Sequence, residues 1–232
     1  MKEGLDLLVV AAHPDDAEIG AGGLMAKYAA AGLRVGVVDL TQAEMSSNGT
    51  PEIRQAESER ASSVLGLAVR VNLGLPDRTF AREPEAIDRL VRAIRELRPR
   101  VVLAPHWDDR HPDHVACSRI TEEAVFSAKL RRYLPDVEPF EVGRLYFYFI
   151  NGWAHPDIAV DVTDVYEIKR RALRCYESQF TPPGTDGRYV ATPLNTGYLD
   201  FVETRDRSVG RLISAEYAEG FAAKGPVRVE RL

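Results

Sequence analysis

The sequence is poor in cysteine and has no long apolar run. Its only cysteines, Cys117 and Cys175, do not form a CxxC pair, so neither a zinc ribbon nor a dithiol redox motif can be drawn. We therefore expect two buried thiols in a reducing compartment. No window approaches the roughly 20 apolar residues of a membrane helix. The N-terminal apolar stretch is only about eight residues long and ends in charge, which favours a core strand over a signal peptide. These absences predict a cytoplasmic protein.

The chain also lacks an excess of positive charge. It has 232 residues, a net charge of -5 and a pI of about 5.6, so the overall balance does not favour nucleic acid, although a local basic patch is still compatible with it. With 45% hydrophobic and 28% charged residues, the composition is typical of a globular protein. No repeat, low-complexity tract or linker divides the sequence. We predict one domain over residues 1–232 that binds a small molecule, with neither nucleic acid nor membrane as partner.

Apolar runs and helical patterns alternate along the first two-thirds of the chain. Short apolar runs bounded by turn residues predict buried strands, and apolar residues at helical spacing predict helices. The strands are expected at residues 5–12, 33–40, 69–73, 101–104, 145–150 and 158–162. The helices are expected at about residues 20–31, 52–65, 85–97, 113–133, 165–177 and 209–222. This alternation predicts an α/β fold with a mostly parallel sheet and helices on both faces.

The first predicted strand runs into the stretch "VVAAHPDDAEIGAGG", residues 9–23. Glycines after a strand can bind the pyrophosphate of a dinucleotide, but that fingerprint needs a GxGxxG spacing directly after the strand. Here His13, Pro14, Asp15 and Asp16 occupy the turn, and two carboxylates would repel a pyrophosphate. The glycines are better explained by close packing of the helix. A non-catalytic nucleotide-binding domain is kept as the alternative from another class.

Three of the five histidines lie in two loops that follow predicted parallel strands. His13 follows the first strand, while His111 and His114 lie in "PHWDDRHPDH", which begins where residues 101–104 end. In a doubly wound sheet both loops open at the same carboxyl edge, so they can converge although they are far apart in sequence. His13, Asp16 and His114 would then supply two imidazoles and one carboxylate. This set leaves a coordination position open, as in catalytic zinc sites. Ferrous iron also accepts these ligands.

The other polar residues of the two loops suggest roles in hydrolysis. Adjacent residues rarely chelate one ion together, so with Asp16 as the ligand, Asp15 is free to act as general base. His111 could stabilise an oxyanion or protonate a leaving amine, and Asp113 could hydrogen-bond a histidine ring. The competing interpretation is structural: HPDD and HPDH are each a helix N-cap with proline at the first helical position. Both interpretations can hold together, because caps also position ligands.

The paired motifs "AHPDDAEIGAGG" and "DDRHPDH" resemble the LmbE/PIG-L family of metal-dependent N-deacetylases, and the resemblance covers most of the chain. The segment "TQAEMSSNGTPEIRQAESERASSVLG" further resembles the bacillithiol-biosynthesis deacetylase branch, which hydrolyses the acetamide of N-acetylglucosaminyl malate. The resemblance implies a Rossmann-like fold and a homo-oligomer, often a hexamer. It also implies that zinc is bound by His13, Asp16 and His114, that Asp15 is the base and that His111 stabilises the transition state.

An anionic sugar conjugate needs cations in its pocket. Arg110 directly precedes His111, and Arg54 follows a polar loop near the start of its helix. Two guanidiniums could bind the carboxylates of a malyl group in bidentate fashion, while Ser47 and Asn48 could bind sugar hydroxyls. The predicted function is zinc-dependent deacetylation of N-acetylglucosaminyl malate. The alternatives are deacetylation of another N-acetylglucosaminide, such as an inositol glycoside or chitin oligomer, and hydrolysis of a thiol S-conjugate amide.

Overall fold

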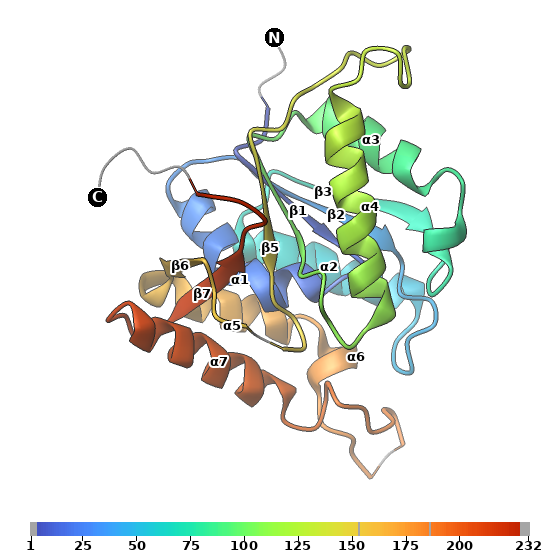
Figure 1. The fold of residues 1–232 in the computed structure, drawn as a ribbon. Coiled ribbons are helices and arrows are strands. Elements are labelled where there is room, and N and C mark those ends of the chain that lie inside the picture. Colours follow the sequence, from blue (N-terminus) through green and yellow to red (C-terminus); the bar gives the residue numbers. More distant parts are fainter. Residues whose placement is uncertain (1–3, 153, 186, 228–232) are drawn as a thin grey trace.

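A seven-stranded sheet forms the centre of the computed structural model, which describes residues 4–152, 154–185 and 187–227. The strand order is β3-β2-β1-β4-β5-β7-β6 (Figure 1). Strands β1 to β5 pair in parallel, whereas β7 runs antiparallel to both β5 and β6. The strands are β1 (Leu7–Ala11), β2 (Val35–Thr41), β3 (Val69–Leu75), β4 (Val101–Pro105), β5 (Arg144–Tyr148), β6 (Ile158–Asp161) and β7 (Ala218–Ala222).

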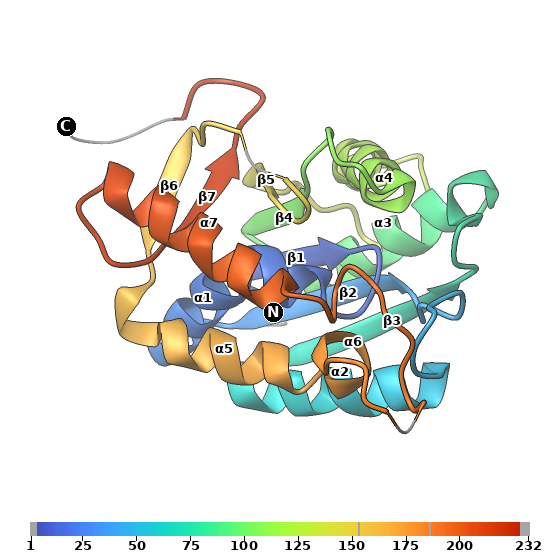
Figure 2. The ribbon, with the colours of Figure 1, turned by 90° about the horizontal axis from the view of Figure 1, so that it is seen from below.

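Helices cover both faces of this sheet (Figures 1 and 2). The helices are α1 (Asp16–Ala30), α2 (Pro51–Leu65), α3 (Ala86–Leu97), α4 (Pro112–Ala128), α5 (Tyr166–Arg174), α6 (Glu177–Phe180) and α7 (Tyr198–Leu212), with short 3-10 turns at Phe80–Arg82 and Thr163–Val165. Alternate residues of β1 enter different cores, because successive side chains of a strand point to opposite faces. Leu7 and Val9 pack with residues of α1, α2 and α5, while Leu8 and Val10 pack with residues of α3 and α4. The predicted fold, a mostly parallel sheet covered on both sides, is confirmed.

The sheet order changes direction at β1, and this positions the two histidine loops. Strand β1 pairs with β2 on one side and with β4 on the other, both in parallel. The loops that follow β1 and β4 therefore leave neighbouring strands at the same carboxyl edge. A crevice at such a switch point is the usual ligand site of an open α/β sheet.

Close packing explains the glycines of α1, as expected. A Cβ on Gly20 would overlap a ring carbon of Tyr148, on β5, and one on Gly23 would lie 2.8 Å from the Val162 side chain. The helix also begins earlier than predicted, at Asp16, so this carboxylate belongs to its first turn.

The C-terminal prediction was wrong. Instead of a helix over residues 209–222, the chain forms α7 at Tyr198–Leu212 and then the strand β7. All five residues of β7 are buried, including Glu219, whose carboxylate receives a hydrogen bond from Lys169. A charged residue in a buried strand gives no alternating pattern, so local periodicity could not reveal it.

Helix α4 ends at Ala128, earlier than the predicted residue 133. The guanidinium of Arg95 donates hydrogen bonds to the carbonyls of Ala128, Leu130 and Leu134, and this contact from α3 holds the chain that leaves the helix. Cys117 is buried as expected, whereas Cys175 is only half-buried, and neither forms a disulfide. None of the described helices combines the length and the hydropathy that a membrane span requires.

Candidate metal centre and active site

Each histidine loop leads directly into a helix. Asp15 occupies the N-cap position of α1 but makes no capping hydrogen bond through its side chain. His111 is the N-cap of α4, and its Nδ1 accepts a hydrogen bond from the backbone N–H of Asp113. The capping interpretation therefore explains His111 in part, but it does not explain Asp15.

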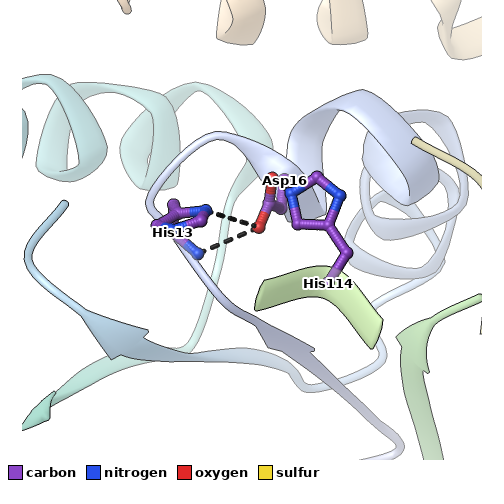
Figure 3. A group of neighbouring side chains, drawn as sticks. All are labelled: His13, Asp16 and His114. Atoms are coloured by element: carbon purple, nitrogen blue, oxygen red, sulfur yellow. Dashed lines mark hydrogen bonds and ion pairs between the residues drawn. The ribbon is translucent and has the colours of Figure 1, made fainter. Parts of the chain in front are cut away.

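His13, Asp16 and His114 come together in space, with one potential ligand atom of each within 4.8 Å of the others (Figure 3). Nδ1 of His13 lies 3.5 Å from Oδ2 of Asp16, and Nε2 of His114 lies 3.1 Å from Oδ1 of the same carboxylate. The backbone N–H of His13 also donates to Asp16 Oδ2, at 2.9 Å, and holds this carboxylate in place.

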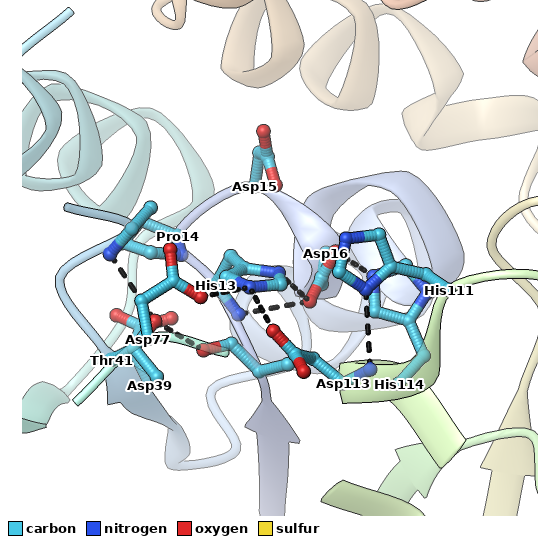
Figure 4. A network of polar contacts seen from close by, with 12 residues as sticks. His13, Pro14, Asp15, Asp16, Asp39, Thr41, Asp77, His111, Asp113 and His114 are labelled. Atoms are coloured by element: carbon cyan, nitrogen blue, oxygen red, sulfur yellow. Dashed lines mark hydrogen bonds and ion pairs between the residues drawn. The ribbon is translucent and has the colours of Figure 1, made fainter. Parts of the chain in front are cut away.

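Carboxylates hold the outer nitrogen of each ring, and Figure 4 shows Asp77 and Asp113 beside His13. Nε2 of His13 lies 3.1 Å from Asp77 Oδ1 and 3.4 Å from Asp113 Oδ2. Nδ1 of His114 lies 3.0 Å from Asp109 Oδ1. Metal-binding histidines characteristically have such a partner, because it fixes the tautomer and leaves the other nitrogen free for the ion. The donor set therefore fits a divalent metal of the zinc type.

A second group of the same kind, His13, His111 and Asp113, overlaps the first. It is a poorer candidate, because Arg78 donates to Asp113 Oδ1 at 2.8 Å and Nδ1 of His111 is already used as an acceptor. His111 is also only half-buried, whereas Asp16 and His114 are buried.

The electrostatics of the cluster favour positive charge. Burial alone would lower the pKa of His114, but Asp16 and Asp109 outweigh it and raise this pKa to about 9. Burial would likewise raise the pKa of Asp16, yet His114 and His13 hold it well below its usual value. A bound cation meets the same carboxylates and is stabilised by them in the same way.

Asp15 is buried like its neighbour Asp16 but differs from it in backbone conformation, in hydrogen-bond partners and in the direction of its pKa shift. Its backbone has a φ of 121°, which is rare for a residue other than glycine and is typical of strained functional positions. Burial raises its pKa to about 6, although Arg54 partly opposes this rise. Arg54 donates to Asp15 Oδ2 at 2.9 Å and also to the Pro14 carbonyl. In Figure 4 the Asp15 carboxylate points away from His13 and His114.

His111 is built to be a neutral hydrogen-bond donor. Its ring stacks on His114 with centroids 4.7 Å apart. Burial lowers the pKa of His111, and the nearby His114 and His13 lower it further. Because Nδ1 accepts from the Asp113 backbone, a neutral ring carries its proton on Nε2.

These residues line a cavity of about 180 Å³, to which both predicted arginines contribute. Arg54 is 2% exposed, and its Nε and Nη1 have no hydrogen-bond partner among the described residues. Arg110 is exposed and donates to Asn151 Oδ1 at 3.1 Å.

The expected contacts of Ser47 and Asn48 need correction. Ser46 lines the cavity, whereas Ser47 is exposed outside it. The Asn48 side chain is used by the chain itself: it accepts from the backbone N–H of Val190 and donates to its carbonyl, both at 2.9 Å. The sequence located the correct loop but not the side chains that point inward.

Among the residues at the site that the motifs do not predict are Asp77, Asp109 and Asn151. Asp77 follows β3 and Asn151 follows β5, so each comes shortly after a parallel strand. Asn151 donates its amide to Asp109 Oδ1 at 2.9 Å and so supports the partner of His114. A search for polar residues after every parallel strand would have found Asp77 and Asn151.

Comparison with known proteins identifies the class. Residues 8–125 match the family described as PIG-L: GlcNAc-PI de-N-acetylase, and the chain belongs to this family. It is an amide hydrolase of the deacetylase class, which excludes the non-catalytic nucleotide-binding alternative.

Two relatives have named substrates. The chain is 31% identical over 189 residues to the diacetylchitobiose deacetylase of Thermococcus kodakarensis, covering 75% of this chain and 70% of that protein. It is 28% identical over 245 residues to the 1D-myo-inositol 2-acetamido-2-deoxy-alpha-D-glucopyranoside deacetylase of Rhodococcus jostii, covering 78% and 84%. The conserved protein TT1542 from Thermus thermophilus has the same fold, with a TM-score of 0.87, 44% identity and 97% of each chain covered.

Proposed function

We propose that this protein is a metal-dependent deacetylase that hydrolyses the acetamide of an N-acetylglucosamine conjugate. The observation that carries the proposal is the group His13, Asp16 and His114, placed with Asp15 and His111 around one cavity at the switch point of the sheet. The two relatives with named substrates both remove acetyl groups from N-acetylglucosamine units, which supports the same substrate class here.

His13, Asp16 and His114 would hold the metal. Zinc is the ion that this donor set suits best, and ferrous iron is the alternative. When bound, the ion supplies Lewis acidity, which polarises the acetamide carbonyl and makes water more acidic.

Asp15 and His111 divide the proton chemistry between them. Asp15 accepts the proton of the attacking water, and its pKa of about 6 allows it to hold and then return that proton. The Nε2–H of His111 donates to the carbonyl oxygen as it becomes an oxyanion. The C–N bond then breaks, Asp15 delivers its proton to the departing amine, and acetate and a free amine are formed.

The proposed substrate is N-acetylglucosaminyl malate. Arg54 and Arg110 both line the cavity. Arg110 is exposed and can bind a carboxylate of the substrate, while Arg54, which is paired with Asp15, adds positive charge beside it. A neutral inositol glycoside or chitin oligomer would leave Arg110 without an anionic partner, and a thiol S-conjugate is the remaining alternative. The resemblance to the family also supports a homo-oligomer, in particular a hexamer, which light scattering on the purified protein would test.

The experiment is an assay of free amine released from N-acetylglucosaminyl malate, diacetylchitobiose and an N-acetylglucosaminyl inositol by zinc-loaded protein. Asp15→Asn should lower kcat by about 10²- to 10⁴-fold while zinc stays bound. Arg110→Glu should lower kcat/KM for the malate conjugate and leave the neutral substrates unchanged. Equal losses on all three would contradict the anionic substrate. If the protein with full metal occupancy hydrolyses none of the three substrates, the proposed deacetylase activity on N-acetylglucosamine conjugates is wrong.

A further inference from the structure

The helix that carries Asp16 is interrupted one turn later. Ala21 departs from helical geometry, with φ of -141° and ψ of 16°. Beyond it, the N–H groups of Gly23 and Leu24 donate to the two carboxylate oxygens of Glu219, at 2.8 and 2.7 Å, as N–H groups at the start of a new helical segment do. Asp16 therefore lies on a short separate turn whose C-terminal carbonyls need other partners.

Arg205, on α7, supplies one of these partners. Its Nη2 donates to the Ile19 carbonyl at 2.7 Å. Its Nη1 donates to the carbonyls of Phe149 and Ile150, at 2.8 and 3.2 Å. One guanidinium thus joins the turn that bears Asp16 to the chain that leaves β5.

The second attachment leads to His114. Ile150 is followed by Asn151, whose backbone N–H and side-chain amide both donate to Asp109, at 3.1 and 2.9 Å. Asp109 in turn lies 3.0 Å from Nδ1 of His114. Arg205 is consequently connected to the Asp16 side and to the His114 side of the proposed metal site.

Arg205 is held rigidly by a buried group of four charges, which we call the buried quartet: Lys169, Arg205, Asp206 and Glu219. Lys169 donates to Asp206 at 2.6 Å and to Glu219 at 2.7 Å, and Arg205 Nε donates to the other Asp206 oxygen at 3.0 Å. All four side chains are buried, and two positive charges balance two negative ones. Because buried charges are costly unless paired, this arrangement fixes the position of each member. The four lie on α5, α7 and β7, beyond the residues 8–125 that match the family.

We propose that Arg205 is a positioning residue that sets the spacing between Asp16 and His114 and thereby the affinity for the metal. This inference rests on the proposed metal site. It assigns a role in the site to the C-terminal elements, which supply none of the three ligands.

The test compares Arg205→Met and Arg205→Lys with a matched control, Arg95→Met. Arg95 is also buried, and its guanidinium also binds backbone carbonyls, but at the C-terminal end of α4. Helix α4 spans about 25 Å at 1.5 Å per residue, so this contact is far from His111 and His114. The probe is zinc itself, measured by competition with a chromophoric chelator, together with the Tm of each protein without and with zinc.

We expect Arg205→Met to bind zinc about 10- to 100-fold more weakly than wild type, the range found when supporting partners of metal ligands are removed. Arg205→Lys, which keeps the charge but can bind fewer carbonyls, should lose less. Zinc should raise the Tm of both variants less than it raises that of wild type. Arg95→Met should lower the Tm with and without zinc alike and keep the wild-type affinity.

Wild-type zinc affinity in folded Arg205→Met would overturn the inference, and so would an equal loss in Arg95→Met. If Arg205→Met does not fold, the comparison of Arg205→Lys with Arg95→Met decides the question in the same way. His114→Ala separates the two levels. If His114→Ala binds zinc as tightly as wild type does, the zinc is bound at another position. That result would overturn the proposed metal site together with the inference.

Discussion

His114 is held through both of its ring nitrogens, one by Asp16 and the other by Asp109. Burial would raise the pKa of Asp109, but hydrogen bonds with His114 and Asn151 lower it to about 2, so Asp109 is charged at neutral pH. Asp109→Asn keeps the shape and removes this charge. We expect zinc affinity to fall about 10- to 100-fold, measured by chelator competition.

The neighbouring Asp108 offers a matched control for this change. It is exposed, and its contacts with His106 use only its backbone atoms. Asp108→Asn should therefore bind zinc as wild type does. If both substitutions left the affinity unchanged, Asp109 would not support a metal ligand.

At the scale of elements, α1 packs closely on β5 only because residue 20 has no side chain. A Cβ added at Gly20 would overlap the ring of Tyr148. Tyr148 is fully buried, and its hydroxyl donates a hydrogen bond to the Val10 carbonyl at 2.9 Å. Gly20→Ala should therefore lower the free energy of unfolding by about 1–3 kcal/mol. Gly225→Ala, where nothing lies within 4 Å of the added Cβ, is the control and should be nearly neutral in denaturant unfolding.

The contact between α5 and α7 predicts a dependence on pH. Arg170 donates to Glu203 at 2.8 Å, and hydrogen bonds from Arg170, Tyr217 and Arg207 lower the pKa of Glu203. Because the folded state binds this proton less readily than the unfolded chain, the stabilisation is complete above the usual pKa of about 4.3 and is lost as the pH falls below it. Glu203→Gln should have a lower Tm than wild type at pH 7.

At low pH the Tm values of wild type and Glu203→Gln should become equal. Thermal melts between pH 7 and pH 3 would show the difference in Tm between wild type and Glu203→Gln shrinking toward zero as Glu203 becomes protonated. A difference that stayed constant over this range would mean that the charge of Glu203 does not stabilise the contact between α5 and α7.

Elements whose burial follows from local pattern were predictable, and elements fixed by distant partners were not. Most of the parallel strands show as apolar runs, whereas β3 alternates apolar and polar residues. The alternation of these strands with helices predicts that His13 and His114 lie at one edge of the sheet. The sequence predicts a helix where β7 forms, because the buried Glu219 depends on partners distant in sequence: the side chain of Lys169 and the backbone N–H groups of Gly23 and Leu24. A distant partner also decides which side chains of the loop at residues 46–48 face the cavity. The sequence predicts the loop, but Asn48 bonds to Val190 and Ser46 lines the cavity.

At the scale of the whole molecule, the proposed metal site joins two loops that the sheet alone brings together. One loop follows β1 and the other follows β4, and the chain between Asp16 and His114 includes three strands and three helices. An ion bound to both loops stabilises only the folded state, because the unfolded chain does not hold these ligands together. By mass action the gain is about 2.7 kcal/mol when free zinc is 100 times its dissociation constant.

The Tm of the protein should therefore rise with zinc concentration and fall again when a chelator removes the ion. His114→Ala should abolish the rise, because two ligands on a single loop no longer connect the two parts of the chain. Asp15→Asn, which alters the proposed base and no ligand, should keep it. If zinc raises the Tm of wild type and of His114→Ala equally, zinc stabilises the protein from a different position. The metal site proposed at the switch point of the sheet would then be wrong.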